Sequence, residues 1–239
     1  TDVGSQSSLA TNSCTAALHL SLMSIGLKPG DEVITTPMTF CATVNTIIHA
    51  GGKPILADCN KEDFCIDPEK VSEKITKNTK AILPVHFAGH SCDMENIMQL
   101  ANDHSLNVIE DCAHAIETTY EDKHAGTFGD FGCFSFFPTK NLGAIGDAGI
   151  TITPNKKYAE KLKKLRNHGG LLRNEHEMLG YNSRMDEIQA AVLGNKKLGI
   201  IELKPKRKFY DYKAKYSASA KTEHIIPVDI TNKNYNKIN

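Results

Sequence analysis

The feature that most limits the possible folds is an alternation of short apolar, β-branched runs with segments of helical periodicity. In residues 93–103, for example, Met94 and Ile97 fall on one helical face, and Asp93 is suited to cap the start. The predicted strands are residues 32–36, 54–57, 81–85, 107–111, 133–137 and 149–153, and the predicted helices are residues 13–25, 40–50, 93–103, 156–168 and 185–201. This alternation predicts an α/β fold with a mainly parallel sheet covered on both faces.

Size and charge narrow the class of protein further. The chain has 239 residues, 40% of them hydrophobic, which suits one large α/β domain or one domain plus part of another. The formal net charge is zero, so we expect neither a nucleic-acid nor a membrane partner. No run approaches the roughly 18 apolar residues of a membrane span. Residues 1–6 lack the basic and apolar segments of a signal peptide.

The cysteines indicate a reducing environment. There are seven of them, and no pair has the Cys-x-x-Cys spacing. An odd number of cysteines, several of them within apolar runs, is typical of reduced and mostly buried thiols in a cytoplasmic protein. The spacing is also too wide to predict a zinc site.

Two residues suggest a specific chemistry. Lys140 follows an apolar strand and a turn that contains Ser135, and a glycine-rich run comes after it. A lysine in such a place is a candidate Schiff-base nucleophile. Asp111 ends an earlier strand, where a carboxylate can either cap a helix or pair with a pyridinium nitrogen. Because ligands of parallel sheets bind beyond the carboxyl ends of the strands, both side chains should reach one crevice. Together they suggest pyridoxal phosphate (PLP) as cofactor.

PLP has further requirements that other residues can meet. Its phosphate needs hydroxyl and N–H donors, which Cys14 and Thr15 at the start of the first helix and Ser135 can supply, although such residues are also common as plain helix caps. Its ring needs a flat neighbour, and Phe40 is either that neighbour or a core aromatic. Its phenolic oxygen needs a donor, and His114 is either that donor or a structural histidine.

Read together, these segments resemble the DegT-like family of PLP-dependent sugar aminotransferases, which belong to the fold type I group. The likeness extends from about residue 10 to about residue 203, with the motifs in the family's order. The matching stretches are residues 13–18 (SCTAAL), 29–34 (PGDEVI), 37–40 (PMTF), 110–115 (EDCAHA), 134–141 (FSFFPTKN), 166–169 (RNHG) and 180–185 (GYNSRM).

The resemblance implies a role for each candidate. Lys140 matches the lysine that bonds to the cofactor and shuttles protons, and Asp111 matches the partner of the pyridine nitrogen. The resemblance further implies that His114 contacts the phenolic oxygen and that Phe40 stacks on the ring. The residues implied to contact the phosphate are Cys14, Thr15 and Ser135. Asn182 matches an asparagine that reaches the phosphate in the neighbouring subunit, which implies a homodimer with shared active sites.

The resemblance also implies the domain organisation. Residues 1–203 are expected to form the PLP-binding large domain, a three-layer fold, and residues 204–239 the start of an incomplete C-terminal small domain. The chain departs from the family pattern at Ala148, where a glycine is usual, and at Pro205, which interrupts a helix.

The implied reaction is the transfer of an amino group from an amino acid, usually L-glutamate, to a nucleotide-linked keto-sugar. Because family members extend further at the C-terminus, the alternative is a truncated or non-catalytic PLP-binding homologue with a regulatory role. A sugar dehydratase of the same fold has histidine in place of the lysine, so Lys140 argues against it. A nicotinamide-dependent enzyme is disfavoured because no G-x-G-x-x-G motif follows the first strand.

Overall fold

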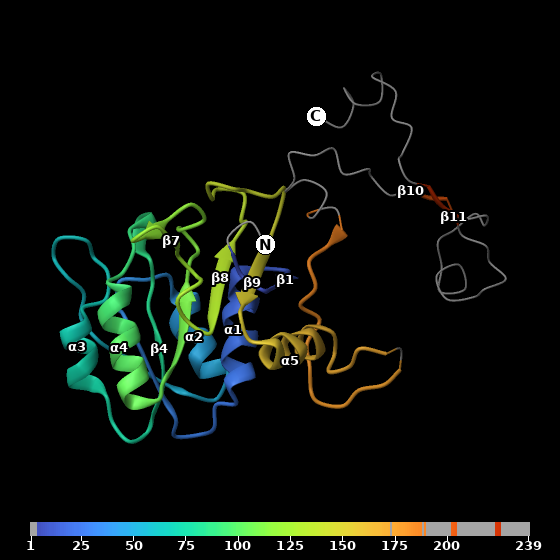
Figure 1. Ribbon diagram of the computed structural model, residues 1–239. Helices are drawn as coiled ribbons and strands as arrows, with labels where there is room; N and C mark the ends of the chain where they lie inside the picture. Colours follow the sequence, from blue (N-terminus) through green and yellow to red (C-terminus); the bar gives the residue numbers. More distant parts are fainter. Residues whose placement is uncertain (1–3, 173, 188, 190–201, 205–222, 226–239) are drawn as a thin grey trace. The chain divides into compact units, whose positions relative to one another are not determined.

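The chain divides into two units, Thr1–Gln189 and Ala190–Asn239. The computed structural model describes residues 4–172, 174–187, 189, 202–204 and 223–225 (Figure 1). In the second unit the described residues are two short strands, β10 (Glu202–Lys204) and β11 (Glu223–Ile225), which pair antiparallel. The helix predicted at residues 185–201 lies almost entirely outside the described residues, and so does Pro205.

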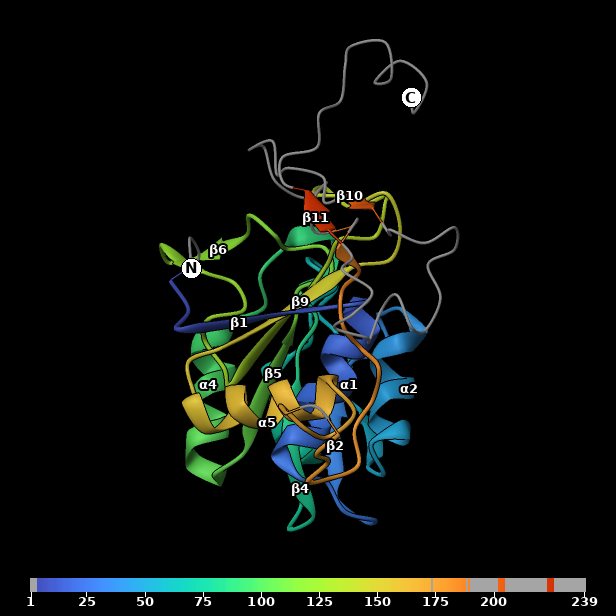
Figure 2. The same ribbon diagram turned by 90° about the vertical axis from the view of Figure 1, so that its right-hand side faces the viewer.

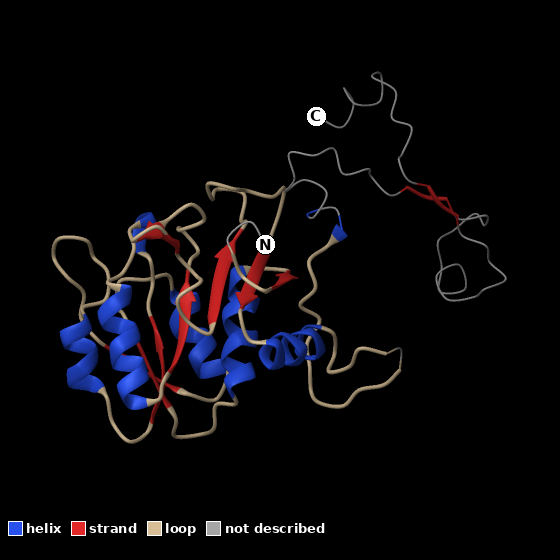
Figure 3. Ribbon diagram, in the orientation of Figure 1, coloured by secondary structure: helices blue, strands red, loops and turns tan. Residues whose placement is uncertain are grey.

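The first unit contains a seven-stranded sheet in the order β1-β9-β8-β5-β4-β2-β3. Figure 3 draws the strands in red and the helices in blue. Its strands are β1 (Ser7–Thr11), β2 (Glu32–Thr35), β3 (Lys53–Leu56), β4 (Thr79–Leu83), β5 (Asn107–Asp111), β8 (Phe131–Ser135) and β9 (Gly149–Thr153). Strands β8, β5, β4, β2 and β3 run parallel to one another, whereas β9 and β1 are antiparallel to their neighbours. The mainly parallel sheet predicted from the sequence is therefore confirmed.

Helices cover both faces of this sheet (Figure 2). They are α1 (Cys14–Ile25), α2 (Cys41–His49), α3 (Pro68–Lys74), α4 (Met94–His104) and α5 (Lys156–Arg166). Alternate strand residues divide between two cores, as the two-residue period of a strand requires. Val33 packs in the core formed with α1, α2 and α5, whereas its neighbour Ile34 packs in the core formed with α3 and α4. The result is the predicted three-layer arrangement.

Capping side chains stand at two helix starts, and the one at Asp93 agrees with the prediction from the sequence. The Ser13 hydroxyl accepts a hydrogen bond from the backbone N–H of Ala16, and the Asp93 carboxylate accepts one from Asn96. These bonds satisfy N–H groups that a helix leaves unpaired in its first turn. The start of α1 is the more important for function, because it lies beside the cavity described below.

Several elements differ from the sequence-based predictions. β4 and β8 each lie two residues nearer the N-terminus than predicted, so Phe136 and Phe137 belong to the turn that follows β8. β1 and α3 were not predicted, nor was the hairpin of β6 (Thr119–Tyr120) and β7 (Lys123–His124). β1 lacks a continuous apolar run, and its position depends on antiparallel pairing with β9, more than a hundred residues away in the chain.

Two further observations concern the class of protein. All seven cysteines are free thiols, and most are buried, as predicted. None of the helices in the part of the chain that the structure describes has both the length and the apolar character needed to cross a membrane.

Candidate active site

A cavity of about 460 Å³ lies at the carboxyl ends of the parallel strands. It is bordered by the start of α1 and by the segments that follow β2, β4, β5 and β8. The loop after β8, which carries Lys140, is the yellow-green segment above the sheet in Figure 1. The predicted site residues that line the cavity are Cys14, Thr15, Phe40, Asp111, His114, Ser135 and Lys140.

Asp111 ends β5 and is only 4% exposed. Its Oδ1 accepts a hydrogen bond from the backbone N–H of Ala113 (3.1 Å), and its Oδ2 accepts one from the Thr43 hydroxyl (2.8 Å). Residues 112–118 contain no helix, so Asp111 does not serve as the helix cap that its position also allowed. The sequence analysis missed Thr43, for which the only local signal was a hydroxyl residue early in a predicted helix.

The electrostatics of Asp111 are set by its burial. Removal from water raises the pKa of the Asp111 carboxyl, while the hydrogen bonds from Thr43 and Ala113 and the nearby His86 and His114 act in the opposite direction. A buried carboxylate of this kind is costly to ionise unless a cation or further donors compensate it. The site therefore favours a positively charged group beside Asp111.

The raised pKa of Asp111 predicts that the folded protein becomes more stable when the negative charge at this position is removed. Because the pKa of Asp111 is raised in the folded state, its contribution favours folding at low pH and is lost as the pH rises through that pKa. In Asp111→Asn the amide can donate to the Thr43 oxygen while its carbonyl accepts from Ala113. We therefore expect the cofactor-free variant to melt about 2–4 °C above wild type at neutral pH.

The measurement is a series of thermal melts at increasing pH. The difference should vanish below about pH 3.9, the ordinary pKa of aspartate, and grow above it. Asp122→Asn makes the same change in an exposed turn and should give no comparable difference. A constant difference at every pH would contradict the argument from ionisation.

Glu110, next to Asp111 in β5, has a different environment because neighbouring strand residues point to opposite faces. It is fully buried, and its carboxylate accepts hydrogen bonds from three backbone N–H groups of the loop at residues 126–129. It also bonds to Nε2 of buried His86 (3.1 Å), whose Nδ1 accepts from the backbone N–H of Cys92. This pattern makes Nε2 the protonated nitrogen of His86. The sequence analysis missed the pair.

The same region offers potential metal ligands. Side-chain ligand atoms of His86, Glu110 and Cys112 lie within 4.8 Å of one another, and all three residues are buried. Both nitrogens of His86 and both oxygens of Glu110 already take part in hydrogen bonds. The cluster is therefore explained as a hydrogen-bonded support beneath the cavity.

Lys140 lies in a tight turn after β8 and is half-buried. Its backbone N–H donates to the carbonyl of Phe137 (2.8 Å), which closes the turn. Glycine is needed at position 143, because a Cβ there would lie 2.5 Å from the carbonyl oxygen of Pro138. The backbone thus holds Lys140 against the cavity without using its amine.

The start of α1 forms another part of the cavity wall. Cys14 and Thr15 are the first residues of the helix, where N–H groups point away from it and favour anions. Burial raises the pKa of the Cys14 thiol well above its ordinary value, so the thiol remains neutral. Ser135, at the end of β8, contributes a further hydroxyl to the cavity wall. A Cβ at Gly149 would lie 2.5 Å from the backbone nitrogen of Cys14, so glycine allows this close approach.

The two aromatic candidates lie at the rim. Phe40 is 76% exposed, so the core alternative for this residue is wrong, and its ring is available to a ligand. His114 is also exposed, and partial desolvation followed by the charge of Lys140 lowers its pKa. His114 is therefore neutral at neutral pH and has one ring N–H to donate.

Asn182 does not line this cavity. It is exposed and pairs with Asn167 through an isolated antiparallel bridge. Within its own chain it is thus separate from the other site candidates.

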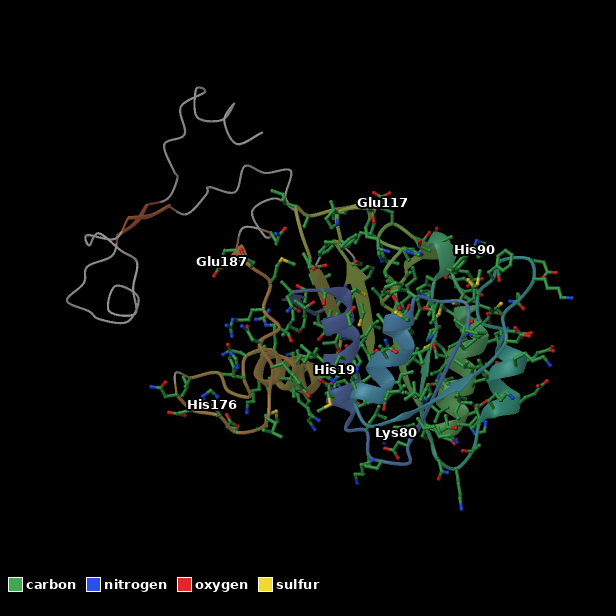
Figure 4. All side chains as sticks on the ribbon, turned by 180° about the vertical axis from the view of Figure 1, so that it is seen from behind. His19, Lys80, His90, Glu117, His176 and Glu187 are labelled. Carbon is green, nitrogen blue, oxygen red and sulfur yellow. The ribbon has the colours of Figure 1, made fainter. Side chains whose placement is uncertain are left out.

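A second, wider cavity of about 940 Å³ adjoins the first, and both are lined by His114, Thr139 and Lys140. The loops that carry His90 and Glu117 border it, and Figure 4 shows these two residues at the end of the molecule opposite Lys80. Its lining is mostly polar. Lys140 therefore lies where a compact cavity meets a larger polar one.

Comparison with known proteins defines the class. Residues 2–231 match the DegT/DnrJ/EryC1/StrS aminotransferase family, and the chain belongs to this family. It superposes on the crystal structure of NtdA from Bacillus subtilis with bound cofactor PMP at a TM-score of 0.75 and 42% identity, covering 80% of this chain and 43% of that one. The fold is thus that of fold type I PLP aminotransferases, as predicted.

Two curated relatives of similar sequence carry different protein names. The chain is 49% identical to a pleiotropic regulatory protein of Geobacillus stearothermophilus, over 75% of this chain and 48% of the relative. It is 46% identical to UDP-N-acetyl-3-dehydro-alpha-D-glucosamine 3-aminotransferase of Acidithiobacillus ferrooxidans, again over 75% and 48%. The chain spans about half the length of the curated relatives it matches.

Proposed function

We propose that the protein is a PLP-dependent transaminase that moves an amino group from an amino acid, L-glutamate, to a nucleotide-linked keto-sugar. The observation that carries this proposal is that one cavity is lined by both the lysine amine and a buried carboxylate. Family membership supports the reaction class.

The residues present fit PLP. Asp111 is a buried carboxylate whose hydrogen bonds within the described part of the chain come from two neutral donors, the Thr43 hydroxyl and the Ala113 backbone N–H, and a ring N–H would supply the missing charged partner. Phe40 offers an exposed ring face, and the start of α1 with Ser135 offers donors to a phosphate. When bound, PLP supplies an electron sink for the carbanion formed at the amino-acid Cα.

Each of the protein residues then has a separate role. Asp111 keeps the ring nitrogen protonated by accepting its hydrogen bond, which a neutral carboxyl could not do as strongly. Lys140 Nζ would hold the cofactor through its aldehyde, and the freed amine would take the proton from the amino-acid Cα and deliver it to the cofactor carbon that carries the nitrogen. His114 donates a hydrogen bond to the phenolic oxygen. The wider polar cavity beside Lys140 provides room for the sugar.

The assembly and the domain boundary belong to the same proposal. Asn182 lies outside the cavity of its own chain, and we infer that it reaches the phosphate of a partner's cofactor in a homodimer. Residues 1–203 would then form the PLP-binding large domain, and residues 204–239 the beginning of a small domain.

The second candidate is a regulatory PLP-binding protein without turnover. The name of the relative from Geobacillus stearothermophilus favours it. This reading predicts the same cofactor contacts, because binding needs the same residues. It differs from the first only in the steps that follow binding.

The test is to load the protein with PLP and add L-glutamate. A transaminase should lose the visible absorbance of the lysine-bound cofactor and release 2-oxoglutarate in a stoichiometric amount. D-glutamate is the control, because its Cα proton points away from Lys140. Binding of PLP with no spectral change on addition of L-glutamate would support the regulatory alternative. Nucleotide-linked 3-keto and 4-keto sugars, added to the aminated protein, then identify the acceptor.

A further inference from the structure

Two threonine hydroxyls connect the rim of the cavity to Asp111. The Thr39 and Thr43 hydroxyl oxygens lie 2.7 Å apart, and the Thr43 hydroxyl lies 2.8 Å from Asp111 Oδ2. Thr43 is only 1% exposed, whereas Thr39 is partly exposed and lines the cavity. The carboxylate is therefore linked through one buried hydroxyl to one that borders the ligand space.

The protonation state of Asp111 sets the direction of this chain. An ionised carboxylate only accepts hydrogen bonds, so the Thr43 hydroxyl must donate its single proton to Oδ2. Its oxygen is then free to accept from Thr39. Protonation of Asp111 would remove this constraint, and the hydroxyl would be free to turn. The hydrogen bond from Thr43 thus favours the charged form of Asp111, against the effect of burial.

Local structure makes the contact possible. Thr39 and Thr43 are four residues apart at the start of α2, and Phe40 between them occupies the cap position. The Thr43 backbone N–H bonds to the carbonyl of Phe40 (3.1 Å). The same turn therefore supplies both the exposed ring of Phe40 and the buried donor to Asp111.

We propose that Thr43 is a positioning residue that holds the Asp111 carboxylate in the orientation and charge state needed to pair with a cofactor ring nitrogen. This inference rests on the proposed function. The hydrogen bonds from Thr43 and Ala113 use one acceptor site on each oxygen of a carboxylate that has about four, so acceptor capacity remains for a ring N–H.

Other groups facing Asp111 do not replace this hydroxyl. Ala113 donates through its backbone to the other oxygen, and this bond remains in any side-chain variant of Thr43. The titratable groups around the carboxylate come from α1, β8 and the segments that follow β4 and β5; they are Cys14, Cys112, Cys133, His86 and His114. Within the described residues, the hydrogen bond to Asp111 Oδ2 comes from Thr43 and from none of these titratable groups.

The experiment compares two cofactors in binding, without any turnover. Dissociation constants are measured for PLP and for its 1-deaza analogue, in which a carbon replaces the ring nitrogen. Thr43→Val removes the hydroxyl at nearly constant shape, and Thr43→Ser restores it. We expect the valine variant to bind PLP about tenfold more weakly than wild type, the size expected for a hydrogen bond to a charged group. Its affinity for the deaza analogue should be unchanged, and the serine variant should resemble wild type.

The outcomes separate the possible explanations. An equal loss for both cofactors would mean that Thr43 acts through packing alone and would overturn the inference, as would no loss for either. In an Asp111→Asn background, Thr43→Val should have no further effect on PLP binding, and an undiminished tenfold loss there would also overturn it. If wild type itself binds neither cofactor, the proposed function fails first and this inference with it. Circular dichroism spectra of each variant check that the fold is intact.

Discussion

Lys140→Ala should abolish the covalent attachment of PLP and reduce transamination at least about 10³-fold. The amine is the group that bonds to the cofactor and then moves the substrate Cα proton, so its removal eliminates both steps. Alanine should leave the fold intact, because the surrounding turn is held by backbone bonds and by the glycine at position 143. PLP should still bind noncovalently through the other contacts.

The measurement is reduction with borohydride followed by peptide mass mapping. Wild type should carry the label on the peptide that contains Lys140, and Lys140→Ala should carry none. Lys80→Ala is the matched control: this exposed lysine lies on β4 at the opposite end of the molecule from His90 and Glu117 (Figure 4). Retention of label and activity in Lys140→Ala, or label on another peptide of wild type, would refute the assignment.

Glu110→Ala should lower the free energy of unfolding by about 3–5 kcal/mol, because it leaves several buried N–H donors without an acceptor and each costs about 1–3 kcal/mol before the structure relaxes. The substitution leaves three backbone N–H groups of residues 126–129 and Nε2 of His86 without their acceptor. A buried donor that loses its acceptor costs its full desolvation energy. Because the loop and His86 both adjoin the strand that ends at Asp111, cofactor binding should weaken as well.

Urea denaturation followed by far-ultraviolet circular dichroism measures this loss. Glu117→Ala removes the same side chain from an exposed position and should change stability by no more than about 0.5 kcal/mol. Glu110→Gln keeps one oxygen acceptor and should be intermediate. A Glu110→Ala variant as stable as Glu117→Ala would show that the network contributes little to the fold.

The parts of the fold that depend on local interactions could be predicted from the sequence. Helix α1 begins after Ser13 and α4 after Asp93, because each capping side chain bonds to a backbone group within three residues. The parallel strands inside the edge strand β3 are recognisable because they are largely buried on both faces and therefore contain apolar runs. β1 was not recognisable, because only its pairing with β9 makes Ser7–Thr11 a strand.

The residues of the candidate site also fall into those that the sequence could predict and those that it could not. Lys140 and Asp111 could be predicted because side chains at the carboxyl ends of parallel strands converge on one edge of the sheet. The surroundings of Phe40 could not, since its 76% exposure depends on which elements pack beside α2. The side-chain donor to Asp111 could not be predicted either, because Thr43 lies 68 positions away from it in the chain.

The sequence by itself therefore determined the layered α/β class, the capped helix starts and the two residues with candidate cofactor chemistry. All of these follow from periodicity and from short-range bonds. Only the tertiary structure decided the environments of Glu110 and Asp111, which both carry a carboxyl group and are adjacent in the chain. One points to the support formed by His86 and residues 126–129, and the other points to the cavity and Thr43. The physical reason is that a strand directs neighbouring side chains to opposite faces, and what each face meets is set by distant segments.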